Sequence, residues 1–307
     1  MVLKKIAVTG ASGLVGRHLL AALSRRGIAC ACACRTRPSA LPTDATWAPW
    51  DLEDWKRSVE LDRLFPGVDA VLHVGAMVPA PGASVSARAT FDANVRASLS
   101  LGEWARGNGV PLLYLSGAIV YGDPERVGIR ETDPVGMNGI GGLYGLTKLQ
   151  AEQVLTHLSR SGLSLCVLRP SSIYGDGLPA GKMITDFLMR ASEGKALELS
   201  PPADDQVNMI HASDVAEAML DAVTHDAWGG VFNIGTPRPV TVREIAEACV
   251  AAVGSGRVVL RPGEAERPAR VRFALVSDLA SAKFGFTTKM DLGHGLNDMW
   301  ERMRAAH

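Results

Sequence analysis

Short apolar runs alternate with helical segments through the first half of the chain. The runs are KKIAVTG, DAVLHVGA, PLLYLSG and LSLCVLRP, and apolar residues recur at helical spacing over residues 14–26, 84–106 and 143–161. A strand that is apolar on both faces needs cover on both sides, which helices provide in α/β proteins. The alternation therefore predicts an α/β fold with a doubly wound parallel sheet. DWKRSVELDRLF, residues 54–65, predicts one more helix.

The regular alternation weakens after residue 172. A loop is expected at PPADDQ and a buried strand at VFNIG, and Thr241 with Glu244 forms a capping box before an amphipathic helix. These features predict a main domain over residues 1–172 and a smaller, mainly substrate-binding lobe over 173–307. Segments within residues 207–234, VNMIH and VFNIG, are expected to return to the main sheet.

Charge and hydropathy narrow the functional classes. The 32 basic and 32 acidic side chains cancel, so the overall field gives no reason to expect nucleic acid or an anionic membrane as partner. No apolar run approaches the roughly 20 residues that cross a bilayer. The first residues, MVLKKIAVTG, have charges followed at once by a short strand-like run, which is not the pattern of a signal sequence. We therefore expect a cytoplasmic protein that binds a small molecule, without nucleic acid or membrane partners.

Three of the five cysteines alternate along one predicted strand. Cys30, Cys32 and Cys34 share a face, where successive side chains lie roughly 6.5 to 7 Å apart. That spacing is too long for a disulfide and poorly suited to a tetrahedral metal, so we predict core packing and no metal site. His73 and His211, at the ends of apolar strands, are likewise predicted to be packed, hydrogen-bonded and without a chemical role.

The turn after the first strand reads TGASGLVG. Glycine at Gly10, Gly13 and Gly16 allows a sharp turn, close approach of a phosphate to the backbone, and tight packing of the helix on the sheet. The N-terminus of the following helix supplies amide donors and the positive end of its dipole. The turn therefore predicts a dinucleotide site, with contacts from Gly10, Ser12, Gly13, Leu14, Val15 and Gly16.

The end of the second strand bears on the choice of cofactor. An acidic residue there would accept hydrogen bonds from the 2′-hydroxyl of NAD, but this strand ends with Arg35 and Arg37 nearby. A guanidinium cannot accept a hydrogen bond and matches a phosphate well, which favours NADP(H). The alternative is that these arginines are solvated surface residues, and NAD(H) then stays possible.

Tyr144 and Lys148 stand one helical turn apart in YGLTK, at the start of a predicted helix. A phenol with an ordinary pKa near 10 is a weak base at neutral pH, but a neighbouring cation favours its ionised form. The pair therefore predicts acid/base chemistry on a substrate oxygen.

Together, TGASGLVG and YGLTK resemble the extended short-chain dehydrogenase/reductase family, in its NAD(P)-dependent nucleotide-sugar epimerase, dehydratase and ketoreductase branch. The resemblance covers nearly the whole chain, because LHVGA, FDANV, LRPSSIYG, IHASDVAEA, FNIG and SDLASAKFGF are also similar to segments of that branch. It implies that Tyr144 is the catalytic acid/base, and that Lys148 lowers the pKa of Tyr144 and holds the nicotinamide ribose. It further implies a homodimer through the helices at 84–106 and 143–161, and cofactor contacts from Asp51, Leu52, Val74, Gly75, Ala76, Asn94 and Pro170.

One departure from the family concerns the hydroxyl that hydrogen-bonds the reacting oxygen. In LSGAIVYG, Gly117 occupies the position that holds serine or threonine in the family, and Ser116 precedes it. Neighbouring strand residues face opposite ways, so Ser116 can replace that catalytic hydroxyl only where the strand end is twisted or bulged. Ser171, Ser172 or a water are the alternatives.

The same segment argues against dehydration. Family dehydratases resemble one another in having Asp and Glu directly after the hydroxyl residue, where this chain has Ala118 and Ile119. Neither of these side chains carries a proton. Reduction of a ketone, or oxidation and re-reduction of a ring carbon, is left as the predicted chemistry.

For the substrate, Arg261 in RPGE resembles the family arginine that pairs with a nucleotide diphosphate. A second family arginine is absent because Val207 occupies its position, although Arg267 or Arg270 could compensate. The resemblance places four residues on the substrate side: Gly117, Arg169, Ser172 and Arg261.

Three functions follow from these patterns. The first is a 4-ketoreductase or epimerase that acts on a nucleotide sugar. The second is a reductase of a non-sugar carbonyl compound, which would tolerate the missing arginine and the glycine at position 117. The third is a non-catalytic dinucleotide-binding sensor or scaffold, which Gly117 favours and which Tyr144 and Lys148 oppose.

Overall fold

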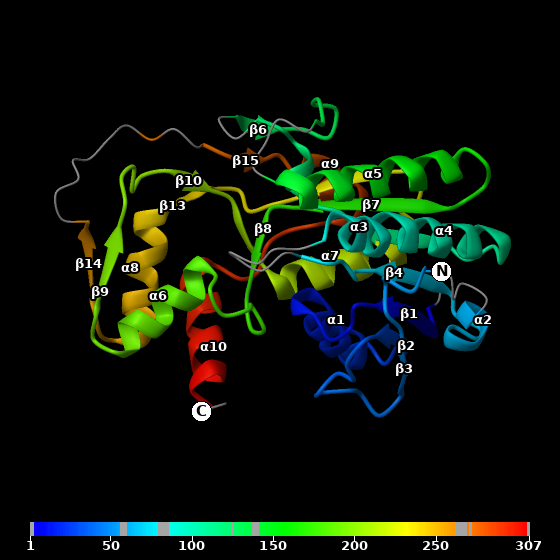
Figure 1. Cartoon of the computed structure of the whole chain (residues 1–307), viewed down its shortest axis with the longest axis horizontal. Helices are drawn as coiled ribbons and strands as arrows, with labels where there is room; N and C mark the ends of the chain where they lie inside the picture. Colours follow the sequence, from blue (N-terminus) through cyan, green and yellow to red (C-terminus); the bar gives the residue numbers. More distant parts are fainter. Residues whose placement is uncertain are drawn as a thin grey trace.

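A computed structural model describes residues 3–55, 60–78, 86–123, 126–136, 141–261, 269 and 272–305 (Figure 1). Its strands are β1 (Lys5–Thr9), β2 (Ala29–Cys34), β3 (Ala45–Pro49), β4 (Ala70–His73), β5 (Leu112–Leu115), β6 (Val127–Ile129), β7 (Leu165–Pro170), β8 (Ser172–Tyr174), β9 (Ala196–Leu199), β10 (Gln206–Val207), β11 (Met209–His211), β12 (Val231–Ile234), β13 (Val240–Thr241), β14 (Arg257–Leu260) and β15 (Ala274–Leu275). Its helices are α1 (Leu14–Arg25), α2 (Leu61–Leu64), α3 (Ala87–Phe91), α4 (Ala97–Gly107), α5 (Gly142–Ser159), α6 (Met183–Ser192), α7 (Ala212–Thr224), α8 (Val242–Val253), α9 (Asp278–Phe284) and α10 (Leu292–Ala305), with a π-helical turn η2 (Asp92–Arg96) and a 3-10 turn η3 (Ala118–Val120).

Seven strands form one parallel sheet in the order β12-β7-β5-β4-β1-β2-β3. At its centre, Ile6 of β1 pairs with Cys30 on one side and with Ala70 on the other. The chain first adds strands outward to β3 and then crosses back to build the other half, ending at β12. This order confirms the predicted doubly wound α/β fold. The carboxyl ends of all seven strands meet at one edge, and the direction of winding changes beside β1.

Alternate residues of the strands face two helical layers. In β2, the side chains of Cys30, Cys32 and Cys34 join a core covered by α1, α7 and α9, whereas Ala31 and Ala33 join a core covered by α2, α4 and α5. The three thiols are buried and free. This confirms the core-packing interpretation of the alternating cysteines.

The C-terminal lobe has a core of its own. Helices α6, α8 and α10 and the strand pair β9–β14 enclose a third apolar cluster, at the left of Figure 1. The predicted capping box starts α8, because the Glu244 amide donates to Thr241 Oγ1 at 3.0 Å and the Thr241 amide donates to the Glu244 carboxylate at 2.7 Å. The domain boundary at 172/173 stays a prediction.

Of the two segments expected to return to the main sheet, only one does. β12 forms its edge beside β7, whereas β11 pairs with β8 in a separate two-stranded sheet. The pairing partner changes between adjacent residues, because the Ser171 amide donates to the carbonyl of Ile234 in β12 and the Ser172 amide donates to the carbonyl of Asn208. The main sheet therefore ends at this point, and β8 leads the chain into the second lobe.

Two predicted helices differ from the structure. The segment at 84–106 is helical from Ala87 to Gly107, but the π turn η2 interrupts its α-helical geometry, and residues 84 and 85 lie outside the described part. A π turn accommodates an extra residue, which apolar periodicity does not reveal. In the segment 54–65, only Leu61–Leu64 is α-helical among the described residues, and 56–59 lie outside them.

Candidate active site

A groove of about 350 Å³ lies at the carboxyl ends of β1, β2, β4 and β5, where the winding direction changes. The start of α5 closes one side of it with Tyr144 and Lys148. Most of the predicted cofactor and catalytic residues line this single groove: Gly10, Ser12, Gly13, Leu14, Val15, Arg35, Asp51, Leu52, Val74, Gly75, Ala76, Ser116, Tyr144 and Lys148.

Main-chain atoms of glycine residues, with no side chains between them, form the floor of the groove. Gly10 has a φ of +68°, and a Cβ there would lie 2.5 Å from Gly75 Cα. A Cβ on Gly16 would lie 2.2 Å from the carbonyl oxygen of Gly10, so α1 packs directly against the turn although Gly16 does not itself line the groove. The N-terminus of α1, with Gly13 as its N-cap, therefore faces the groove with exposed backbone, as the glycine spacing predicts.

The end of β2 carries cations and no carboxylate. Arg35 lines the groove, Arg37 lines a neighbouring cavity, and Thr36 between them lines both. Arg35 and Arg37 are exposed, and neither guanidinium pairs with a carboxylate within the described residues. Arg37 is therefore placed beside the predicted cofactor groove and not in it.

Several residues that line the groove were not predicted from the sequence. Trp50 is the most informative, because it is buried and its indole Nε1 has no hydrogen-bond partner within the described residues. Its position directly before Asp51 and Leu52 was the signal that could have identified it. The lining residues that were not predicted are Ala33, Cys34, Thr36, Trp50, Met77, Val78, Ala93, Leu115 and Ile173.

Lys148 is buried at the inner end of the groove. Its ammonium donates a 2.6 Å hydrogen bond to the carbonyl oxygen of Leu115 and lies 4.2 Å from the centre of the Tyr114 ring. Burial lowers the pKa of Lys148 to about 7, and the charge of Glu152 opposes that shift only in part. This lysine therefore changes its charge near neutral pH.

The predicted depression of the Tyr144 pKa is wrong for the protein on its own. Burial raises the pKa of the Tyr144 phenol to about 12. The reason is that the ammonium of Lys148 points to the Leu115 carbonyl, so removal of the phenol from water dominates. Tyr144 is therefore a phenol, poised as a proton donor.

Ser116, and not Gly117, faces the groove. Ser116 is buried, and its hydroxyl has no hydrogen-bond partner within the described residues. β5 ends at Leu115 and the 3-10 turn η3 begins at Ala118, so strict strand alternation no longer fixes the direction of the residues between them. Ser116 thus lines the groove together with Tyr144 and Lys148, and its catalytic role stays a prediction.

Asn94 does not line the groove, and its predicted cofactor contact stays a prediction. Its amide oxygen accepts from the Met77 amide at 2.6 Å, and its amide nitrogen donates to the Met77 carbonyl and to Thr147 Oγ1, both at 3.0 Å. Thr147 in turn donates to the carbonyl of Tyr144 at 2.9 Å. Asn94 is therefore a positioning residue, which joins the π turn, the loop after β4 and the helix that carries Tyr144.

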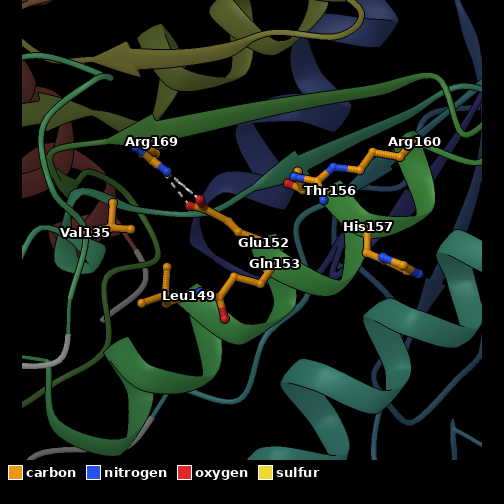
Figure 2. A pocket seen from close by; sticks show the side chains of 8 residues that line it. All are labelled: Val135, Leu149, Glu152, Gln153, Thr156, His157, Arg160 and Arg169. Carbon is orange, nitrogen blue, oxygen red and sulfur yellow. Dashed lines mark hydrogen bonds and ion pairs between the residues drawn. The ribbon is translucent and has the colours of Figure 1, made fainter.

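Arg169, a predicted substrate contact, is engaged with other side chains and does not line the groove. Its guanidinium pairs with Glu152 at 2.6 Å and donates to the Tyr121 hydroxyl at 2.9 Å, and both members of the ion pair are buried. Figure 2 shows this pair at the back of a separate cavity of about 300 Å³, along the outer face of α5. Arg169 is held by Glu152 because a buried guanidinium requires a counter-charge.

The other predicted contacts lie away from the groove lining. Ser172 is exposed in β8, and Arg261 follows β14 in the second lobe, with its amide donating to the Leu199 carbonyl at 2.9 Å. Arg267 and Arg270 lie outside the described residues. The predicted site residues that do not line the groove are Gly16, Arg37, Asn94, Gly117, Arg169, Pro170, Ser172 and Arg261.

His73 is a buried structural residue, as its place in an apolar strand predicts. Its ring nitrogens form hydrogen bonds with Thr9 Oγ1 at 2.7 Å and with Ser98 Oγ at 2.9 Å. Burial lowers the pKa of His73 to about 3, with a smaller contribution from the charge of Lys148. The imidazole is therefore neutral and tied to β1 and to α4.

A model of the NAD dependent epimerase/dehydratase family matches residues 6–235. The chain belongs to this family. UDP-glucose 4-epimerase of Neisseria meningitidis serogroup B is 27% identical over 339 residues, with 97% of this chain and 96% of that protein covered. UDP-glucose 4-epimerase of Azospirillum brasilense is 30% identical over 269 residues, with 78% and 75% covered. Among solved structures, MoeE5 in complex with UDP-glucose and NAD is 27% identical at a TM-score of 0.80, over 98% of this chain and 99% of that one.

These matches confirm the resemblance drawn from TGASGLVG and YGLTK. This member of the epimerase/dehydratase family is an enzyme of the extended short-chain dehydrogenase/reductase type. Its family uses NAD, so a nicotinamide dinucleotide is its cofactor class.

Proposed function

We propose that this chain transfers hydride at a ring carbon of a nucleotide-activated sugar, as an NAD(P)-dependent 4-epimerase or 4-ketoreductase. The observation that carries the proposal is the unpartnered hydroxyl of Ser116 in the same groove as the Tyr144 phenol and Lys148. A buried hydroxyl without a partner is costly, and a substrate oxygen would satisfy it. The UDP-glucose 4-epimerases among its relatives support a nucleotide sugar as substrate.

The groove fits a dinucleotide by its own chemistry. The exposed backbone at Gly10 and Gly13, at the N-terminus of α1, suits a pyrophosphate. Trp50 offers an unpartnered N–H near Arg35, Asp51 and Leu52, where we place the adenosine. The nicotinamide end is assigned to the opposite side: Val74, Gly75, Ala76, Ser116, Tyr144 and Lys148. When bound, the cofactor supplies or accepts the hydride.

Tyr144 and Ser116 handle the proton of the reacting oxygen. The raised pKa keeps the Tyr144 phenol protonated at neutral pH, so it donates to the oxygen of a carbonyl that is being reduced and recovers that proton when an alcohol is oxidised. The Ser116 hydroxyl donates a second hydrogen bond to the same oxygen and stabilises developing negative charge. The positive charge of Lys148 in its ammonium form stabilises the Tyr144 phenolate that forms when the phenol gives up its proton.

Epimerisation and simple reduction differ in where the ketone comes from, because an epimerase forms it from the bound alcohol and a ketoreductase takes it up as substrate. An epimerase returns the hydride to the other face of the same ring carbon, and a ketoreductase releases the alcohol with oxidised cofactor. Dehydration is disfavoured because Ala118 and Ile119 cannot carry a proton where family dehydratases have acids. The full-length coverage of the UDP-glucose 4-epimerases favours the epimerase.

The test is a substrate panel with the purified chain. Interconversion of UDP-glucose and UDP-galactose without net change in cofactor absorbance supports the epimerase, whereas stoichiometric oxidation of NADPH by a keto-sugar nucleotide supports the ketoreductase. Absence of both reactions, in protein that binds the dinucleotide, rejects the proposal.

The NADP(H) preference is also part of this proposal. Arg35 in the groove and the lack of a carboxylate at the end of β2 favour a 2′-phosphate over a free 2′-hydroxyl. The family description names NAD, so NAD(H) is the alternative to be measured in parallel.

A second candidate is a reductase of a non-sugar carbonyl compound. It is favoured by Val207, which stands where the family's second diphosphate-pairing arginine would be and forms part of β10. Turnover of simple ketones with kcat/KM above that of keto-sugar nucleotides would select this function.

Assembly and location stay predictions. The outer faces of α4 and α5, which lie side by side in Figure 1, are the surface that we propose for a homodimer. Sedimentation velocity measures the oligomeric state directly, and a single monomer species at micromolar concentration would refute the homodimer.

No helix within the described residues is both long and apolar enough to cross a membrane. We retain a cytoplasmic location as a proposal for fractionation experiments.

A further inference from the structure

A second and larger cavity adjoins the cofactor groove on the outer side of α1. Its volume is about 690 Å³, and it is bounded by α1, the loop after β2, the start of α7 and α10. Only Ser12 and Thr36 line both the cavity and the groove. Neither the acid/base residues nor the residues assigned to the nicotinamide line this cavity, so the proposed reaction gives the cavity no role.

Four arginines line this cavity, which we call the arginine cavity: Arg17, Arg25, Arg37 and Arg302. Two aspartates also line it, and each pairs with one of the arginines, Asp176 with Arg17 at 3.4 Å and Asp298 with Arg302 at 3.0 Å. Arg37 has no carboxylate partner within the described residues. Arg25 pairs with Glu217, outside the lining, at 2.7 Å, so the lining carries an excess of positive charge and one uncommitted guanidinium.

The most buried polar side chain of the lining is His211, which is 1% exposed. Its Nδ1 accepts a hydrogen bond from the Ser213 amide at 3.2 Å, so the proton of the neutral ring is assigned to Nε2. Burial lowers the pKa of His211 to about 4, which keeps the ring neutral at physiological pH. Nε2 has no partner within the described residues and is therefore a donor without an acceptor.

His18 adds a second imidazole to the same wall. Its Nε2 forms a hydrogen bond with the carbonyl oxygen of Asp176 at 3.2 Å, and its ring packs edge-on against His211 with centroids 5.2 Å apart. The ring N–H of His18 is thus committed to Asp176, so the wall presents the arginine cations and the Nε2–H of His211, while its two carboxylates are already paired. This combination recognises an anion with several acceptor oxygens.

We propose that the arginine cavity binds a phosphate monoester group. Guanidinium groups match phosphate geometry with paired donors, and a phosphate dianion suits an excess of positive charge. The cavity extends from Thr36 and Ser12 to His211 and Arg302, which do not line the cofactor groove, so we assign the phosphate to a separate phosphorylated small molecule, and a 2′-phosphate of NADP(H) that reaches in from the groove is the alternative that the test must exclude. The inference does not depend on the sugar substrate proposed above.

Isothermal titration calorimetry of the full chain, without added cofactor and at low salt, tests this site with inorganic phosphate as probe. We expect saturable binding that weakens about tenfold in Arg302→Gln, since one charge-assisted hydrogen bond is worth roughly that factor. Arg304→Gln is the matched control, because Arg304 lies on the same helix and pairs with Glu301 outside the cavity. Equal binding in both variants, or no saturable binding, overturns the proposal.

Titrations repeated with saturating NADH and NADPH separate the two sources. Phosphate binding that survives NADH but not NADPH assigns the cavity to the 2′-phosphate of the cofactor and overturns the proposal. Phosphate binding that survives both assigns it to a separate phosphorylated compound. Loss with both dinucleotides places the probe at the pyrophosphate loop and overturns the proposal. Because all arms report binding, their outcome is independent of whether the chain turns over nucleotide sugars.

Discussion

The ammonium of Lys148 donates a 2.6 Å hydrogen bond to the carbonyl oxygen of Leu115, the last residue of the strand that leads into Ser116. The bond joins α5 to the end of β5 inside the groove, so the lysine is buried before any substrate arrives. Its pKa falls to about 7 for that reason.

The first prediction concerns stability and pH. The folded chain releases the Lys148 proton near pH 7, whereas the unfolded chain keeps it until about 10.5. The unfolded state therefore binds more protons between these values, and this lysine makes the free energy of unfolding rise with pH. Urea denaturation at pH 7 and pH 9 should show roughly 2 kcal/mol less rise in Lys148→Met than in the wild type.

Lys283→Met, on the exposed face of α9, is the control for that measurement and should follow the wild type. A pH dependence of Lys148→Met that matches the wild type would show that burial does not lower the pKa of Lys148 in the folded chain.

The second prediction is that Ser116→Ala lowers kcat by about 100-fold or more without weakening cofactor binding, because one donor to the reacting oxygen is lost. Ser171→Ala is the matched control, since Ser171 is also buried with an unpartnered hydroxyl but does not line the groove. Gly117→Ser should not rescue Ser116→Ala, although a Cβ at 117 would lie at an ordinary 3.6 Å from Ile119. Rescue would return the catalytic hydroxyl to position 117.

The third prediction is that Tyr144→Phe abolishes turnover and leaves the Kd of the dinucleotide nearly unchanged, because the ring stays and only the proton-carrying hydroxyl is removed. Tyr174→Phe removes another buried hydroxyl, which donates to the Asp291 carbonyl away from the groove, and should retain activity. Initial rates and fluorescence titration give the two readouts. Retained activity in Tyr144→Phe would remove this residue from the mechanism.

The fourth prediction concerns the choice of cofactor. Arg35→Ala combined with Arg37→Ala should weaken NADPH binding at least tenfold more than NADH binding, because only NADPH carries the 2′-phosphate that a guanidinium recognises. Arg63→Ala, on the exposed side of α2, should change neither affinity. Equal weakening of both dinucleotides would contradict the NADP(H) assignment.

The fifth prediction follows from the buried ion pair of Arg169 with Glu152. Glu152→Gln leaves its guanidinium buried without a counter-charge, so the free energy of unfolding should fall by about 3 kcal/mol. KM for the substrate should not change, since the pair does not line the groove. Glu301→Gln, in an exposed pair with Arg304, should be nearly silent. A large rise in KM with unchanged stability would restore Arg169 to the substrate site.

The parts of the site that the sequence could predict are those fixed by local geometry. The glycines at positions 10, 13 and 16 require a turn before a helix wherever they occur after a strand, and Tyr144 and Lys148 share a helix face by their spacing alone. Gly10, Gly13, Tyr144 and Lys148 do line one groove, and Gly16 packs α1 against the turn beneath it. Cys30 and its neighbours followed from strand alternation in the same way.

The remaining features depend on packing across the chain. The sequence predicts Arg169 as a substrate contact, but in the structure its charge is neutralised by Glu152, which lies 17 residues away on a helix. The direction of Ser116 depends on where β5 ends, and no periodicity marks that residue. The contacts of Asn94 arise from the π turn, which brings it to Met77 and Thr147. The Tyr144 pKa follows from burial, which YGLTK alone does not reveal.

The contact between Gly10 and Gly75 has a consequence for how this protein can change over generations. Two main chains meet there with no room for a methyl group between them, and no rearrangement of nearby side chains can create that room. Descendants of this enzyme are free to exchange small apolar residues along the adjoining strands, as the mixture of alanine and cysteine in β2 already illustrates. Gly10, where an added methyl group would meet the main chain of Gly75, is the position where variation should stop first.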